Sequence, residues 1–416
     1  MRILKLTPRL EKRLLARRAQ GDSQAQKVAA EIVSDVHLRG DTALLAWTRK
    51  LDDANFGMKD LWIAEKEISS AKRSVSPDFM RAVRQASRNI QRVAEKQLPL
   101  SWKLEVEPDV RISQRVLPIE SIGCYIPGGN ASLLSTLLMT AVPAQVAGVP
   151  RIVAVCPKPN NELLAAAYFL GVKEIARIGG AQAIAGLAYG TKSVPRVEKI
   201  FGPGNKYVTA AKQIVSADCA IDLPAGPTEA IVLAERGNAR WIAADLLAQA
   251  EHAEDAVSFF VTTSQNLARE VQREVKWQLE ELPFGWARFS TKLNGAILVA
   301  DSLEQGIEFV NRFAPEHLSL PSDANTLLRR IRSSGTVFLG PWGAQPLGDY
   351  VSGSNHVLPT AGWARRRGGL SAADFVKCIS VQTNSRKGFS RLAAGAETLA
   401  EAEGLLAHRN AVRVRR

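Results

Sequence analysis

The sequence has few cysteines, and their spacing excludes a crosslinked scaffold or a cysteine-based zinc site. Cys124, Cys156, Cys219 and Cys378 are far apart in a chain of 416 residues and form no Cys-x-x-Cys pair. We therefore interpret them as small buried hydrophobic residues. A reducing cytoplasmic environment is the expected location of such a chain.

Long hydrophobic runs are also missing. No stretch approaches the roughly 18 uncharged apolar residues of a membrane span, and the N-terminus lacks the apolar core of a secretory signal. We expect no membrane partner. A repeat period of about 20–50 residues is not found either, which argues against a solenoid. The content of 46% hydrophobic and 23% charged residues is that of a globular protein.

Acidic residues are outnumbered, and the formal net charge is +13. On charge alone, a nucleic-acid-binding protein is an alternative, and its affinity would fall steeply with salt. However, much of the charge lies near the two ends of the chain, and the internal cluster Arg365–Arg367 has only Trp363 close to it. The interleaved aromatic residues that stack on bases are missing. We expect a solvated basic surface that favours anionic ligands, and no nucleic-acid partner.

Short apolar runs alternate with helical patterns of about ten residues from about residue 118 onward, and again after Pro227. This alternation is typical of βαβ units, whose ligands bind at the carboxyl ends of parallel strands. We predict an α/β fold with two Rossmann-like parallel-sheet domains and helical N- and C-terminal arms. The expected boundaries are an N-terminal helical arm at 1–23, a first α/β domain at 24–117 with 233–368, an inserted α/β domain at 118–232, and a C-terminal helical tail at 369–416.

The stretch Asp245–His252 follows a helical pattern that opens near Trp241. Asp245, Gln249 and His252 fall on one face at 3.6 residues per turn. A helix with a polar, solvated side explains this pattern as well. The scarcity of histidine favours a functional face, because the chain has five histidines in total.

Three further places carry residues suited to catalysis or metal binding. Glu316-His317 follows a proline, and such a pair can transfer protons, although a capped turn with a surface histidine is as good an explanation. Asp349 follows a glycine, as in an ordinary turn. His408 and the nearby Glu403 lie in the tail, where a surface position is the simpler explanation. A ligand set of Gln249, His252, Asp349 and His408 offers nitrogen and oxygen atoms that suit zinc or manganese.

Two glycine-rich loops follow predicted strands. Gly179–Gly186 does not fit the dinucleotide fingerprint G-x-G-x-x-G, and strand-to-helix packing explains it as readily as a phosphate site. Gly202-Pro203-Gly204-Asn205 is more specific, because it places glycines and an amide at a helix start, where free N–H groups favour anions.

Ten segments, in order, resemble the histidinol dehydrogenase family nearly end to end from about residue 27. They are residues 125–129, 138–144, 179–185, 200–205, 223–227, 245–252, 314–318, 348–350, 353–360 and 407–412. The resemblance implies a homodimeric, zinc-dependent enzyme that oxidises L-histidinol to L-histidine in two steps with two NAD. Paralogues with the same machinery oxidise other amino or sulfonated alcohols, and such a substrate is the alternative.

The resemblance also implies a role for each matching residue. His317 would remove the alcohol proton, and Glu316 would activate water for the aldehyde stage. The domain at 118–232 would bind NAD, and the domain at 24–117 with 233–368 would hold the metal and acid–base residues. The cofactor contacts would be Tyr125, Gln182 and Asn205. The zinc ligands would be Gln249, His252, Asp349 and His408, and the substrate contacts would be Thr228, Gln249, His252, His317, Asp349, Glu403 and His408, with Glu403 and His408 reaching the partner subunit's site.

Three departures from the family pattern stand out. Thr228 replaces the usual serine, which keeps the hydroxyl and adds a methyl group. Gly343-Ala344-Gln345 replaces the common Ser-Pro-Glu and could reshape the loop of Asp349. Residues 1–20 are the least family-like part, and their basic amphipathic pattern predicts a helix that docks onto a partner subunit.

Overall fold

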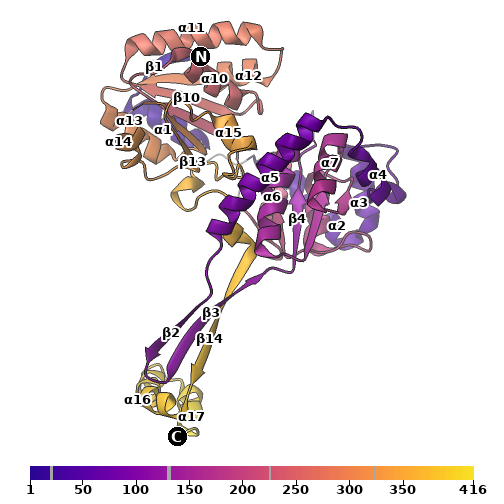
Figure 1. Ribbon diagram of the computed structural model, residues 1–416, viewed down its shortest axis with the longest axis vertical. Coiled ribbons are helices and arrows are strands. Elements are labelled where there is room, and N and C mark those ends of the chain that lie inside the picture. The colour runs from indigo at the N-terminus through magenta and orange to yellow at the C-terminus, as the bar shows by residue number, and fades with distance from the viewer. Residues whose placement is uncertain (19–21, 129–132, 224–225, 323) are drawn as a thin grey trace.

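The computed structural model describes residues 1–18, 22–128, 133–223, 226–322 and 324–416. Figure 1 shows two lobes side by side and a long arm that projects away from them. Each lobe is built on a parallel sheet, so the predicted fold class is confirmed. Within the described ranges, no helix is long and apolar enough to cross a membrane.

Sheet A forms the lobe that contains the N-terminus (Figure 1), and all of its strand pairs are parallel. Its strand order is β1-β11-β10-β9-β12-β13. The strands are β1 (Arg2–Lys5), β9 (Glu229–Leu233), β10 (Val257–Thr262), β11 (Ala296–Val299), β12 (His317–Leu320) and β13 (Thr336–Leu339).

Helices cover both faces of sheet A because its strands alternate apolar side chains to either side. Ile231 and Leu233 pack in one hydrophobic cluster, while Val232 between them packs in another with α10 and α11. The helices of this lobe are α1 (Pro8–Arg18), α10 (Ala239–Ala250), α11 (Gln265–Glu281), α12 (Trp286–Leu293), α13 (Leu303–Phe313), α14 (Ala324–Leu328) and α15 (Gln345–Tyr350).

The N-terminus differs from the predicted helical arm. The helical expectation is wrong for β1, which pairs with β11 at the sheet edge. Ile3 packs toward one face and Leu4 toward the other, which is the two-residue period of a strand. Helix α1 does follow, but its Leu10 is buried in the core of its own chain.

Sheet B forms the second lobe, with parallel strands in the order β6-β5-β4-β7-β8. The order reverses between β4 and β7, and ligands of such sheets bind at the carboxyl ends beside this reversal. The strands are β4 (Ser121–Tyr125), β5 (Arg151–Val155), β6 (Glu174–Ala176), β7 (Lys199–Phe201) and β8 (Ala220–Ile221).

Helices α2 to α5, which follow α1 in the chain, pack in the lobe of sheet B against α6, α7, α8 and α9. This packing differs from the expected grouping of residues 24–117 with 233–368. These four helices bury their apolar faces against the helices of sheet B. The helices of this lobe are α2 (Ser23–Arg39), α3 (Asp41–Leu51), α4 (Glu65–Ala71), α5 (Pro77–Gln97), α6 (Leu134–Ala147), α7 (Asn161–Leu170), α8 (Gly180–Tyr189) and α9 (Lys206–Val215).

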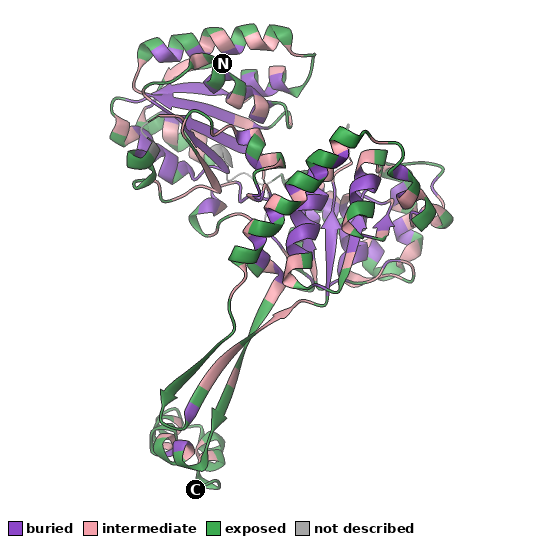
Figure 2. Ribbon diagram, viewed as in Figure 1, coloured by how far each residue is buried: buried purple, intermediate pink, exposed green. Residues whose placement is uncertain are grey.

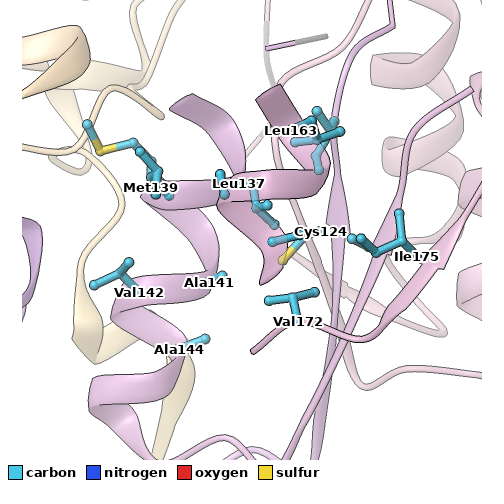
Figure 3. Close-up of a cluster of buried hydrophobic side chains, with 14 of the residues drawn as sticks. Cys124, Leu137, Met139, Ala141, Val142, Ala144, Leu163, Val172 and Ile175 are labelled. Carbon is cyan, nitrogen blue, oxygen red and sulfur yellow. The ribbon is translucent and has the colours of Figure 1, made fainter. Parts of the chain in front are cut away.

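Helix α6 lies in the middle of this lobe, and most of its first three turns are buried (Figure 3). Leu137 and Ala141 pack toward Cys124 of β4 in the close-up. The sequence predicts an interruption at Pro143, but the helix continues to Ala147. Tertiary packing on all sides here outweighs the cost of the proline.

The arm is an antiparallel sheet in the order β14-β3-β2 that carries two helices at its tip (Figure 1). The sequence predicts a linker between Pro99 and Pro108 and a helical tail, and both predictions miss strands. The arm elements are β2 (Trp102–Glu107), β3 (Val110–Pro118), β14 (Val376–Asn384), α16 (Arg386–Ala402) and α17 (Leu406–Arg413). Much of the arm is exposed, including Cys378, which we expected to be buried (Figure 2).

Three short 3-10 helices complete the elements, at Met58–Asp60, Trp363–Arg365 and Ala372–Phe375. The loop between α15 and the second of them connects the two lobes. Asn89 of α5 donates to the carbonyl of Val351 at 2.7 Å, and Asn355 donates to the carbonyl of Met139 at 2.7 Å. These bonds fix α15 relative to sheet B.

Candidate functional site

Helix α10 and the turn that follows it bring Gln249 and His252 to the end of sheet A at which its strands begin. The helix begins after Asn238, whose side chain accepts from the backbone N–H groups of Arg240 and Trp241. Gln249 is 2% exposed, and His252 lies just beyond the last turn, where it is exposed. The His252 Nδ1 atom is 3.0 Å from the carbonyl of Ala248. Because a carbonyl only accepts, Nδ1 carries the hydrogen and Nε2 is left to bind a ligand.

A chain of hydrogen bonds connects Gln249 to the start of β12. The Gln249 amide donates to the hydroxyl of Thr228, and that hydroxyl donates to the Glu316 carboxylate. The same Glu316 oxygen accepts from the backbone N–H of Glu229 at 2.9 Å. Thr228 and Glu316 lie before the neighbouring parallel strands β9 and β12, so the site forms at the amino ends of these strands. Sequence pattern alone does not indicate this pairing.

His317 lies between two carboxylates. Its Nδ1 is 3.8 Å from Glu316 Oε2, and its Nε2 is 3.4 Å from Asp349 Oδ1 of α15. Both separations are ion-pair distances, and within the described residues neither ring nitrogen has a hydrogen bond of good geometry. Burial lowers the pKa of His317, but the charges of Glu316 and Asp349 outweigh it and leave the pKa raised. The arrangement therefore keeps a buried imidazole ready to take up a proton.

Asp349 stays ionised despite its burial. Burial raises the pKa of Asp349, but His317 beside it, together with His356 and His252, leaves the pKa lowered. The His356 Nδ1 donates to the backbone carbonyl of Asp349 at 3.0 Å, and burial lowers the pKa of this imidazole. No role for His356 is predicted from the sequence. Its signal was the scarcity of histidine together with the conspicuous Ser354-Asn355-His356 setting.

The changed segment before Asp349 has a defined anchor. Gln345 is buried at the start of α15, and its amide donates to the hydroxyl of Ser319 on β12 at 3.2 Å. Helix α15 is thereby fixed to the strand that begins with His317. The segment 343–345 holds the helix of Asp349 through a side-chain bond.

Glu403 and His408 do not join these residues within one chain. They lie at the tip of the arm, where both side chains are exposed and α17 is far from both lobes (Figure 1). In the described part of the chain, no group of three or more His, Cys, Asp or Glu side chains is arranged to hold a metal ion. A site that used His408 would therefore need a second copy of the chain.

Tyr125 and Gln182 lie at the carboxyl end of sheet B. Tyr125 ends β4, and its hydroxyl accepts from the backbone N–H of Gly180 at 3.1 Å. Burial raises the pKa of Tyr125 to about 12, so the phenol stays protonated at neutral pH. Gln182 is fully buried in the first turn of α8, and its amide donates to Asp52 at 2.9 Å. Gly129, the last residue of the motif at 125–129, is outside the described residues.

Asn205 caps α9 and is exposed. It lies in the loop after β7, which pairs with β4, the strand that ends at Tyr125. Its side-chain oxygen accepts from the backbone N–H groups of Tyr207 and Val208, so the amide NH2 remains available to a ligand. Gly202, three residues earlier, has φ of +116°, and a side chain there would collide with the Tyr125 carbonyl. The loop from Gly202 to Asn205 and the end of β4 therefore lie against each other at the reversal of strand order.

A buried ion pair holds this loop. Lys212 and Asp222 pair with each other, and their side chains are 4% and 1% exposed. Lys212 also donates to the carbonyl of Gly202 at 2.9 Å, and Asp222 accepts from the Gly202 N–H at 2.8 Å. Both backbone groups of one glycine are thus fixed by the two members of the pair.

The internal basic cluster is largely engaged within the protein. Arg367 donates to the Asp374 carboxylate at 2.9 Å, and Arg365 donates to the carbonyl of Arg312. The Arg366 guanidinium stacks 4.8 Å from the ring centre of Trp363. These contacts give the cluster a structural role.

Comparisons with known proteins match the chain over nearly its whole length. The family model described as histidinol dehydrogenase matches residues 15–416. The chain is 43% identical to the histidinol dehydrogenase of Methanosarcina barkeri, over 97% of this chain and 95% of that protein. It is 44% identical to that of Geobacter metallireducens, over 97% and 94%. The crystal structure of histidinol dehydrogenase from Elizabethkingia anophelis superposes with a TM-score of 0.93, at 38% identity and over 100% and 98% of the two chains.

Proposed function

The chain belongs to the histidinol dehydrogenase family, and from this membership we propose that it oxidises L-histidinol to L-histidine, through L-histidinaldehyde, with NAD. The observation that carries the proposal is the connected set of Gln249, Thr228, Glu316, His317 and Asp349 at the amino edge of sheet A. This set brings together an imidazole that can accept a proton, two carboxylates and an amide.

We propose a zinc ion held by Gln249, His252, Asp349 and His408 of the partner subunit. The chemistry of the ligand atoms fits, because all four residues offer nitrogen or oxygen. The His252 Nδ1 atom bonds to the carbonyl of Ala248, which leaves Nε2 free to bind the metal. When bound, zinc would hold and orient the substrate's imidazole and amine. The deprotonated state of Asp349 supports its place in this set.

We assign the two proton-transfer steps to His317 and Glu316 of this chain. In the first step, His317 takes the hydroxyl proton as the substrate carbon loses a hydride, which gives the aldehyde. In the second step, Glu316 takes a proton from water as the oxygen adds to the aldehyde carbon, and the hydrate loses a second hydride to give the acid. Glu316 has one oxygen occupied by Thr228 and Glu229, which leaves the other for water. NAD, when bound, accepts the hydride in each step.

We propose that Tyr125, Gln182 and Asn205 contact the cofactor. They lie around the carboxyl ends of β4 and β7, where the strand order of sheet B reverses. The buried Gln182 Oε1 has no hydrogen-bond partner among the described residues, which fits a position that a ligand completes.

We propose a homodimer in which the arm of each subunit completes the other's site with Glu403 and His408. The arm supports this, because it exposes large apolar side chains that an isolated chain leaves in water. They include Trp102, Leu104 and Val106 on β2 and Leu399, Leu405 and Leu406 near the tip.

A paralogue that acts on another amino or sulfonated alcohol is the second candidate. The high identity to proteins named histidinol dehydrogenase favours L-histidinol. The deciding experiment supplies purified protein with L-histidinol and NAD and follows NADH, with and without a chelator and added zinc. We expect two NADH for each histidine formed and loss of activity that zinc restores. Turnover of other alcohols without turnover of L-histidinol would identify the paralogue.

A further inference from the structure

Gln182 uses only half of its amide within the protein. Its Nε2 donates to Asp52 Oδ2 at 2.9 Å, while Oε1 is buried and has no hydrogen-bond partner in the described part of the chain. A buried acceptor without a donor is costly and uncommon. The orientation of this amide is fixed by chemistry, since a carboxylate accepts hydrogens and only the NH2 end of Gln182 can face it.

Asp52 comes from a different part of the fold. It follows the last residue of α3, and its backbone N–H donates to the carbonyl of Thr48 at 2.9 Å. Burial raises the pKa of Asp52, while Lys158, the Gln182 amide and the backbone N–H of Gly179 oppose this rise. The carboxylate therefore lies close to the N-terminus of α8, where it accepts from the Gln182 amide in the first turn of that helix.

This position has a consequence for anion binding. The N-terminus of a helix after a glycine loop commonly binds phosphate. At α8 a carboxylate of the same chain already takes that place, and a pyrophosphate would be repelled from it. The loop that ends at Asn205, at the N-terminus of α9, remains for the anionic part of a dinucleotide.

We propose that Asp52 is a positioning residue of the cofactor site, which engages the NH2 of Gln182 so that Gln182 presents only its oxygen to an N–H donor of the bound dinucleotide. The proposal rests on the proposed NAD contacts of Tyr125, Gln182 and Asn205. NAD has two amino groups that can serve as the donor, one on the nicotinamide carboxamide and one on the adenine.

The surroundings of Gln182 Oε1 agree with this role. Gly180 has φ of +63°, and a side chain there would lie 2.5 Å from Oε1, so the glycine leaves the oxygen room. The Gly180 N–H bonds to the Tyr125 hydroxyl, and the negative charge of Asp52 acts on that phenol as well. Asp52, Tyr125 and Gln182 thus form one unit. Because Oε1 is buried among the described residues, a donor of the dinucleotide can contact it only after neighbouring side chains move.

The first test uses the unaltered enzyme and two cofactor analogues. Nicotinamide hypoxanthine dinucleotide lacks the adenine amino group, and 3-acetylpyridine adenine dinucleotide lacks the carboxamide NH2. We expect one of them to bind about tenfold more weakly than NAD, because it leaves the Gln182 oxygen without a donor. Equal binding of NAD and both analogues would overturn the proposal without any variant.

The second test compares Asp52→Asn with Asp53→Asn. Asp53 is the exposed neighbour, and its substitution makes the same change of charge. An asparagine at 52 can offer either end of its amide, so Gln182 is free to turn over. We expect Asp52→Asn to raise the KM for NAD about tenfold and to lose the discrimination between analogues, with kcat within about twofold and the KM for L-histidinol unchanged. Asp53→Asn should match the unaltered enzyme.

An equal KM for NAD and equal discrimination between analogues in the two variants would contradict the role of Asp52. Gln182→Ala separates this failure from that of the proposed function. If Gln182→Ala weakens NAD binding and Asp52→Asn does not, Asp52 has no positioning role. If Gln182→Ala leaves NAD binding intact, the cofactor assignment itself is wrong.

Discussion

The Thr228 hydroxyl connects two residues of the proposed chemistry, because it accepts from Gln249 and donates to Glu316. Compared with the serine that the resemblance implies at this position, threonine adds one methyl group. Thr228→Val keeps the volume but leaves the Gln249 amide without its acceptor and removes one of the two hydrogen bonds to Glu316. We expect kcat/KM for L-histidinol to fall about 10- to 100-fold, which corresponds to about 1.4–2.8 kcal/mol. Thr228→Ser is the control and should stay within about twofold.

His317 is proposed to remove the alcohol proton and is not a metal ligand in that scheme. His317→Asn keeps a polar, although smaller, side chain beside Asp349 but removes the base. We expect the oxidation of L-histidinol to slow about 10²- to 10⁴-fold, the usual worth of a general base. Zinc content, measured on the purified variant, should remain that of the unaltered enzyme. Loss of the metal together with the activity would assign His317 to the ligand set.

Asp245 lies on the polar face of α10 but outside the hydrogen-bonded set. Burial raises its pKa from 3.8 to about 6. Between these values the folded protein binds more protons than the unfolded chain, so this group makes stability fall as pH rises from about 4 to about 6.

Asp245→Asn removes that titration. Because Asp245 is partly exposed, we expect the variant to gain about 1–2 kcal/mol over the unaltered protein at pH 7 and little at pH 4. Urea unfolding of the metal-free protein at both pH values measures the difference. A gain of the same size at both values would show that packing rather than charge is responsible.

The loop between β7 and α9 is held by the ion pair of Lys212 and Asp222, which bonds to both backbone groups of Gly202. Asp222→Asn would leave the ammonium of Lys212 buried without its partner charge. We expect a loss of about 3–5 kcal/mol in the free energy of unfolding. Asp22→Asn removes an exposed pair with Lys206 and keeps an oxygen to cap α2, so it should cost far less stability than Asp222→Asn. Similar losses in both variants would contradict the role assigned to burial.

The elements themselves follow from the sequence to different degrees. Helix α10 is predicted from its helical pattern, and the strands near 152–156 and 200–201 are predicted from short apolar runs between turn residues. Strand β14 is missed because most of its side chains are exposed, so it lacks an alternating apolar pattern. Helix α6 continues through Pro143 because burial on all sides decides there, which local propensity does not show.

The arm makes a specific prediction for the assembled molecule. In a shared site, His317 of one subunit works with His408 of the partner subunit. Co-expression of His317→Asn and His408→Asn chains in equal amounts would form mixed dimers with one intact site. We expect the mixture to recover about a quarter of the activity of the unaltered enzyme, while each variant alone stays near zero. Without recovery, the two residues would belong to the same chain's site.

The sequence by itself determined the α/β class, the glycine loops after predicted strands and helix α10 with Gln249 on it, because these depend on local period and spacing. His252 is predicted on the same helix but lies beyond its end at Ala250. Only the tertiary structure decided that Thr228 bonds to Glu316, that His356 lies on Asp349, and that Asp52 engages Gln182. These contacts join residues 7 to 130 positions apart in the chain. They arise from strand order and helix packing, which no local pattern of residues encodes.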